Sequence, residues 1–161
     1  MTALPRARDP YANVPLPALL YATRGTYTEA VRRAQAKAGC EDVPASGELI
    51  LNAMEWSGAS LERIVRWLGV TKQAVSQAVE TLVVRGYLER TRDASDRRRV
   101  NLLPTAKGRA AGKAARAAIE ALDRELRARV GAQHIAYTRT TLLALREIKL
   151  HHRGRTPAEG A

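Results

Sequence analysis

The chain of 161 residues has a single cysteine, Cys40, no phenylalanine, and only 4% aromatic residues. One cysteine cannot form an internal disulfide, which excludes a small secreted fold held together by disulfides. With so few aromatic side chains, the core must be built from Leu, Val, Ile and Ala, which suits packed helices. The sequence has no run of ~18 apolar residues, and residues 1–10 lack the apolar stretch of a signal peptide. We therefore expect a cytoplasmic protein that does not enter a membrane.

The charge of the chain is strongly one-sided. There are 27 Lys and Arg residues against 16 Asp and Glu, which gives a net charge of +11. Such an excess attracts polyanions, of which nucleic acid and an anionic membrane surface are the main candidates. Residues 60–109 hold eleven Lys and Arg against five Asp and Glu, about half of the excess in under a third of the chain. This concentration favours a nucleic-acid footprint over a uniformly basic, solvated surface.

Hydrophobic periodicity and capping residues predict a mainly α-helical chain with a small β-hairpin. Helices are expected over 16–38, 45–56, 61–67, 72–85, 106–130 and 132–150, and strands over 87–92 and 99–103. The predicted apolar stripes carry Leu16, Leu19, Leu20, Tyr27, Ala30, Val31 and Ala34; Leu49, Ile50, Ala53 and Met54; Ala110, Ala114, Ala118, Leu122 and Leu126; and Ile135, Leu142, Leu145 and Ile148. The segments 1–14 and 153–161 are expected to be an irregular leader and a flexible tail.

The strongest functional signal lies in residues 60–103. Ser60 and Thr71 are good helix N-caps, and the link from Leu68 to Thr71 is a tight turn between two helices. In the second of these helices we expect Val75, Val79 and Leu82, with Ala74 and Ala78 beside them, to face inward. The opposite face is polar, and it carries Lys72, Gln73, Ser76, Gln77 and Glu80.

Such a face is suited to reading a DNA groove. A glutamine can pair bidentately with adenine in the major groove, and a serine can bond a base edge or a phosphate. Lys72 lies in the first helical turn, where a cation opposes the helix dipole unless a phosphate is nearby. An ordinary amphipathic surface helix would show the same spacing, so this helix does not decide the matter alone.

The hairpin loop adds the second half of the signal. Arg97, Arg98 and Arg99 are consecutive at its tip, where they repel one another and contribute nothing to a core. Arginines at a loop tip fit the narrow minor groove, in which the negative potential is concentrated. Asp93 and Asp96 are expected to hold these guanidinium groups in place.

At this point the residues resemble a known family. Leu68–Arg90, with Thr-Lys-Gln-Ala-Val-Ser-Gln at its centre, is similar to the helix-turn-helix of the MarR (multiple-antibiotic-resistance regulator) family. The run Asp93-Ala-Ser-Asp-Arg-Arg-Arg99 resembles that family's wing, and Val100–Gly108 resembles the following strand and helix entry. The match is strong over about 60–110 and is one of element order over about 16–150. Pro104 stands where the family has Leu, and Gln77 stands where Arg is frequent.

The resemblance implies a winged helix-turn-helix protein that binds DNA as a homodimer. On that basis residues 45–104 form the DNA-binding domain, and 15–44 with 105–152 form the helical dimerisation region. The expected DNA-binding residues are Ser60, Thr71, Lys72, Gln73, Ser76, Gln77, Arg97, Arg98 and Arg99. The implied target is a pseudo-palindromic operator in double-stranded DNA, and the implied activity is repression that a small molecule relieves. The alanine-rich stripe of 106–130 also favours close packing against a partner helix, although packing within the chain would explain it as well.

A ligand pocket is expected where the first, second and fifth helices meet. Tyr21, Arg24, Tyr27 and Trp56 are the candidate lining residues, although Tyr27 and Trp56 also suit a core. The basic character of the chain favours a small anionic aromatic effector.

Other sites are disfavoured. Cys40 follows Gly39 at the end of the first helix, whereas the family's redox-sensing cysteines lie near its start, so an inert thiol is expected. Glu147, His151 and His152 offer too few ligands for a metal at a fraying helix end. No catalytic constellation or phosphate-binding glycine loop is present, so the sequence predicts no enzyme and no cofactor. Two alternatives remain open: an architectural DNA-binding protein without a dedicated operator, and a winged-helix module that binds another protein.

Overall fold

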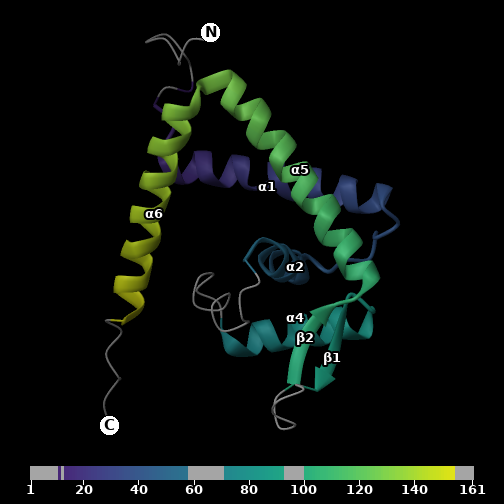
Figure 1. The fold of residues 1–161 in the computed structure, drawn as a ribbon. Coiled ribbons are helices and arrows are strands. Elements are labelled where there is room, and N and C mark those ends of the chain that lie inside the picture. The colour runs from purple at the N-terminus through teal and green to yellow at the C-terminus, as the bar shows by residue number, and fades with distance from the viewer. Residues whose placement is uncertain (1–10, 12, 58–70, 93–99, 155–161) are drawn as a thin grey trace, which may run out of the picture. The chain divides into compact units, whose positions relative to one another are not determined.

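The computed structural model describes residues 11, 13–57, 71–92 and 100–154. Its elements, labelled in Figure 1, are α1 (Leu16–Lys37), α2 (Ala45–Ser57), α4 (Lys72–Val84), β1 (Leu88–Arg92), β2 (Val100–Pro104), α5 (Ala106–Val130) and α6 (Ala132–Gly154). The mainly helical fold with one hairpin is confirmed in these ranges, with most bounds within two residues of those predicted. The predicted helix 61–67, the hairpin loop and most of the leader lie outside the described residues. Of the predicted flexible tail 153–161, residues 153–154 belong to α6 instead, and 155–161 lie outside the described residues.

Two compact units make up the chain. The larger is Leu16–Ala121, which holds α1, α2, α4, the hairpin and most of α5. The smaller comprises Met1–Pro15 and Leu122–Ala161, and therefore holds the end of α5 and all of α6. None of the described helices is long and apolar enough to cross a membrane.

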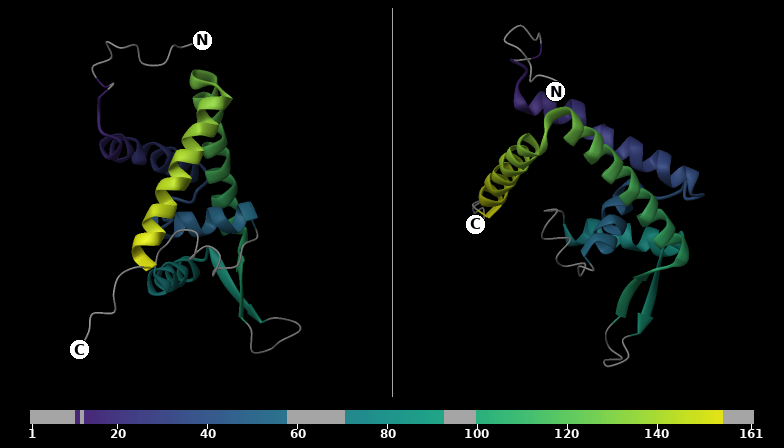
Figure 2. Two further views of the ribbon diagram at one scale, coloured as in Figure 1. Left: turned by 90° about the vertical axis from the view of Figure 1, so that its left-hand side faces the viewer. Right: turned by 45° about the horizontal axis from the view of Figure 1, so that its top comes forward.

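The core of the larger unit is built around α2, α4 and β1, which contact one another in that order (Figures 1 and 2). The side chains of Leu82, Tyr87 and Leu88 are almost wholly buried there. Among the described residues, the buried cluster is Cys40, Ile50, Leu51, Val75, Ala78, Val79, Leu82, Tyr87, Leu88 and Ala111. Aliphatic residues thus form this core around a single tyrosine, as the scarcity of aromatic residues predicts.

Helix α4 ends where the sequence predicts, and the reason is local. Gly86 has φ +72°, a left-handed conformation that glycine adopts without steric cost. The Gly86 amide donates to Val83 O at 2.9 Å and the Tyr87 amide donates to Leu82 O at 2.8 Å. This pair of bonds is a Schellman motif, which satisfies the last carbonyls of the helix and directs the chain into β1.

The hairpin is antiparallel and in regular register, from the pair Leu88 and Pro104 to the pair Arg92 and Val100. Pro104 is the last residue of β2, where a missing amide donor is tolerated. Thr105 then begins α5 by two contacts. Its hydroxyl donates to Gly86 O at 2.6 Å and accepts from the Gly108 amide at 3.1 Å, which confirms the predicted helix cap.

Two predicted helix faces, those of α2 and α4, differ in part from the structure. Leu49, expected to face inward, is 53% exposed, whereas Leu51 is buried. Ala74 is exposed, although Ala78 one turn later is buried. On α5 the buried residues are Gly108, Ala111, Gly112 and Ala115, and the predicted stripe beginning at Ala110 lies on the adjacent face. Periodicity locates an apolar stripe, but the packing partner decides which side of that stripe is covered.

Candidate nucleic-acid interface

Helix α4 presents a polar face to solvent, and its start is fixed by a cap. Thr71 is extended at φ −74° and ψ 150°, and its side-chain oxygen accepts from the Ala74 amide at 3.1 Å. This bond satisfies one of the amides that a helix start leaves without a partner in the helix. Lys72 follows in the first turn and is exposed. The positive end of the helix dipole and the lysine charge therefore lie together, which favours an anion.

The predicted reading residues all lie on the solvent side of α4. Gln73, Ser76 and Gln77 are exposed. The buried side of the helix consists of Val75, Ala78, Val79 and Leu82. Because these four residues anchor α4 in the core, the three polar side chains are held on a rigid support and point away from it.

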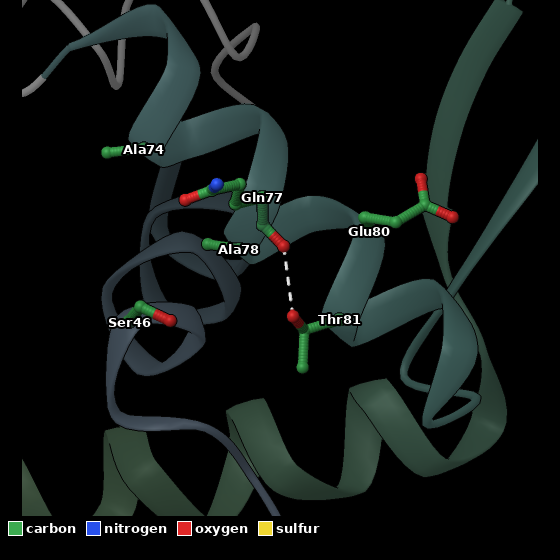
Figure 3. A pocket seen from close by; sticks show the side chains of 6 residues that line it. All are labelled: Ser46, Ala74, Gln77, Ala78, Glu80 and Thr81. Atoms are coloured by element: carbon green, nitrogen blue, oxygen red, sulfur yellow. Dashed lines mark hydrogen bonds between the residues drawn. The ribbon is translucent and has the colours of Figure 1, made fainter.

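A hollow flanks this face on the side of α2 (Figure 3). Its volume is about 600 Å³, and it is lined by Ser46, Ala74, Gln77, Ala78, Glu80 and Thr81. The Thr81 hydroxyl donates to Gln77 O at 2.9 Å, so it bonds the backbone of its own helix. Gln77 points toward this hollow, whereas Glu80 points away from it toward the hairpin (Figure 3). The amide of Gln77 thus has open space in which to reach a ligand.

Glu80 bonds to the hairpin instead. Its Oε2 accepts from Arg90 Nη2 at 2.5 Å, which joins the outer side of α4 to β1. Helical spacing predicts Glu80 on the polar face of α4, but no sequence motif gives Arg90 a role. Strand alternation offered a signal, because Arg90 shares a face with the buried Leu88.

The junction behind α4 is held by a polar cluster that sequence reasoning missed. The Tyr87 hydroxyl donates to Asp42 Oδ1 at 2.5 Å, and Lys107 Nζ donates to the same oxygen at 3.0 Å. Lys107 also lies 4.2 Å from the centre of the Tyr87 ring and donates to Arg85 O at 3.1 Å. The cluster therefore connects the α1–α2 loop, the end of α4 and the start of α5.

These contacts perturb two pKa values in that cluster. The hydrogen bond from Tyr87, followed by that from Lys107, lowers the pKa of the Asp42 carboxyl. Burial, followed by the bond to Asp42, raises the pKa of the Tyr87 hydroxyl. Both shifts favour an ionised Asp42 and a neutral Tyr87, which is the state that these bonds require.

The remaining predicted site residues fall into two groups. Ser60, Asp93, Asp96 and Arg97–Arg99 lie outside the described residues, as does the side chain of Trp56. Tyr21 and Tyr27 of α1 are 74% and 38% exposed, and Arg24 Cζ lies 5.2 Å from the centre of the Tyr21 ring. The hollow beside α4 includes none of these α1 residues.

Cys40 is buried at 3% exposure. Its Sγ lies 3.6 Å from Ala38 O and 3.9 Å from Lys107 O. Among the described residues, no three His, Cys, Asp or Glu side chains gather as a metal site would require.

The order of the described elements, with a hairpin that follows an exposed polar helix, is that of a winged-helix fold. The sequence model of the MarR family matches residues 49–99, which span that helix and the hairpin loop. This match covers about a third of the chain, which is therefore similar to the MarR family in that part.

Solved structures share this fold over most of the chain. The MarR family protein Rv2887 of Mycobacterium tuberculosis, in complex with salicylic acid, is 27% identical over 83% of this chain and 98% of its own, with a TM-score of 0.53. CouR of Rhodococcus jostii RHA1, bound to p-coumaroyl-CoA, is 23% identical over 82% and 92%, with a TM-score of 0.60. FabT of Streptococcus pneumoniae, in complex with DNA, is 21% identical over 84% and 96%, with a TM-score of 0.61. A comparison with curated protein sequences gives no match.

Proposed function

We propose that this chain is a homodimeric, sequence-specific repressor that binds a pseudo-palindromic operator in the cytoplasm. The observation that carries the proposal is the exposed face of α4, where Gln73, Ser76 and Gln77 stand behind the Thr71 cap on a buried apolar base. A face of donors and acceptors on a rigid helix fits the major groove, where the four base pairs are distinguishable. The solved complex of FabT with DNA supports DNA as the ligand of this fold.

The individual contacts follow from the chemistry of each side chain. Thr71, Lys72 and Arg97–Arg99 supply charge and backbone contacts, while Gln73, Ser76 and Gln77 supply base readout. Ser60 is a further candidate for a phosphate contact, and Asp93 with Asp96 would position the wing arginines.

Dimerisation is the second part of the proposal. Apolar side chains of α1, α5 and α6 keep much of their surface in water: Leu16, Leu19, Leu126, Leu142, Leu143, Leu145 and Ile148 are each at least 41% exposed. An exposed apolar surface of this kind favours association. A two-fold partner would place the two copies of α4 about one DNA turn apart, ~34 Å.

Selection of bound sequences from random duplex DNA tests the proposal. We expect recovery of an inverted repeat whose half-sites are separated by about one helical turn. Recovery of no consensus, with tight binding to all duplexes, would favour an architectural DNA-binding protein. No binding to any duplex at low salt would favour a winged-helix module that binds an acidic protein.

Release by an anionic aromatic effector is the third part. Rv2887 with salicylic acid and CouR with p-coumaroyl-CoA show aromatic ligands on this fold. The candidate contacts here are Tyr21, Arg24, Tyr27 and Trp56, because aromatic rings and a guanidinium suit a ring that bears a carboxylate. Salicylate and 4-hydroxycinnamate should raise the melting temperature and lower operator affinity, and Arg24→Ala should weaken both effects. The absence of any shift at millimolar ligand would contradict this part alone.

A further inference from the structure

An exposed ion pair joins the outer side of α4 to the hairpin. Arg90 Nη2 donates to Glu80 Oε2 at 2.5 Å, and the two side chains keep 48% and 55% of their surface exposed. Exposed ion pairs contribute little to the stability of a fold. Stability alone therefore does not explain this contact. Its position beside the predicted base-reading residues suggests a role in binding instead.

Glu80 lies on the same outward ridge as the predicted base-reading residues. It follows Gln73 by seven residues and Gln77 by three, which places the three side chains along one side of the helix. Glu80 is the only carboxylate in α4, whose other charged residue is Lys72. An unpaired carboxylate on this ridge would meet the negative potential of DNA and oppose binding.

Arg90 lies where a cation can offset that charge and also reach DNA. It shares a strand face with Leu88, which is 1% exposed, and it pairs across the hairpin with Leu102, which packs against the core. Arg90 therefore continues the face of the hairpin that covers α4, but lies at its solvent edge. Glu80 accepts from one terminal nitrogen of a group that has five N–H donors, so the other donors can bind an anion.

We propose that Arg90, oriented by Glu80, binds a phosphate of the DNA backbone at the edge of the groove that α4 enters. Arg90 is then a DNA-contacting residue and Glu80 is a positioning residue. The pair also cancels the negative charge on the reading ridge, so that α4 can approach the duplex. This inference rests on the proposed DNA-binding function and adds a contact beyond the residues that the sequence predicted.

The test compares Arg90→Ala, Glu80→Gln and the double variant by fluorescence anisotropy across a range of salt concentrations. The probe is the duplex recovered by selection, or a mixed-sequence duplex of about 30 base pairs if selection recovers none. Arg90→Ala should weaken binding about tenfold at ~50 mM salt. It should also reduce the salt slope, that is, the steepness with which the logarithm of the affinity falls with the logarithm of the salt concentration, by about one. Between ~50 and ~200 mM salt, that loss should shrink by about three- to fourfold.

The double variant distinguishes a phosphate contact from an ion pair that only links α4 to the hairpin. In Arg90→Ala the carboxylate of Glu80 is left facing DNA, so adding Glu80→Gln should restore part of the affinity but not the slope. Arg90→Lys keeps the charge and should retain the slope. Arg33→Ala removes another exposed arginine of an ion pair, with Glu29 on α1, and serves as the control.

Two results would overturn the inference. One is an Arg90→Ala variant whose salt slope equals that of the wild type, even if its melting temperature or affinity falls. The other is a loss in Arg90→Ala no greater than that in Arg33→Ala. Failure of the wild type to bind any duplex would instead remove the proposed function itself, and the two failures are therefore distinguishable.

Discussion

Gln77 is exposed on the outer side of α4 and also faces the hollow beside α2. Its amide offers a donor and an acceptor, which match adenine in the major groove, and one such bidentate pair gives ~1–3 kcal/mol of discrimination. We predict that Gln77→Ala reduces discrimination at one position in each half-site by about 5- to 100-fold. Binding to singly substituted operators measures this.

Gln133 provides a control for that substitution. It is an exposed glutamine of α6 whose Nε2 donates to the Tyr137 hydroxyl at 2.9 Å. Gln133→Ala should leave every position of the operator equally well discriminated. Unchanged discrimination in Gln77→Ala would show that this amide does not read a base.

Glu48 illustrates how burial acts on a single carboxyl. The residue is 7% exposed, and desolvation raises its pKa above 4.5 despite the ion pair with Arg32 at 3.3 Å. A raised folded-state pKa means that the stability contribution is fully present below pH 4.5 and is lost as the pH rises through the folded value. Glu48→Gln removes this loss, so its melting temperature relative to wild type should increase between pH 4 and pH 7.

Thermal unfolding at a series of pH values checks this, with Glu29→Gln as the control. Glu29 is exposed and pairs with Arg33, so its replacement removes a solvated carboxylate and not a buried one. The raised pKa of Glu48 would be contradicted if the difference in melting temperature between Glu48→Gln and wild type were constant with pH or fell as the pH rose.

At the scale of elements, α5 approaches β1 so closely that only glycine fits. A Cβ on Gly108 would lie 2.0 Å from the Tyr87 carbonyl oxygen, a backbone atom that cannot turn aside. We predict that Gly108→Ala destabilises the protein by about 1–3 kcal/mol or more, because α5 must move away from the hairpin. Urea denaturation measures the loss.

Gly25 is the matched control, since it also lies inside a helix but has nothing within 4 Å of an added Cβ. Gly25→Ala should stabilise α1 by about 0.5–1 kcal/mol through helix propensity alone. Equal changes in the free energy of unfolding for the two substitutions would show that Gly108 of α5 does not lie tightly against the Tyr87 carbonyl.

At the scale of the whole molecule, the proposed dimer depends on the apolar side chains of α6. Leu145 is 41% exposed and Ile148 is 54% exposed. We predict that Leu145→Glu shifts the protein from dimer to monomer in sedimentation experiments, because a carboxylate cannot be buried in an apolar interface without a partner. Operator affinity should fall by more than tenfold, because the two recognition helices no longer bind together.

Leu49→Glu is the corresponding control, because Leu49 is similarly exposed but lies on α2. It should leave the oligomeric state unchanged. A Leu145→Glu variant that remains dimeric and binds the operator normally would rule out α6 as the interface.

The sequence alone determined the features that depend on neighbouring residues. The start of α4 at Thr71, its end at Gly86 and the two strands of the hairpin follow from caps, glycine conformations and alternation, which act within a few residues. The exposed polar face of α4 is predictable for the same reason, since helical spacing fixes which side chains share a side.

The tertiary structure decided everything that joins distant parts of the chain. The pairing of Glu80 with Arg90, the cluster around Asp42, and the exposure of Leu49 depend on how α2, α4 and the hairpin are oriented in space. An apolar stripe predicts that a helix packs, but its exact buried side is set by the shape of the surface it meets. That shape is a property of the assembled core, and no local pattern contains it.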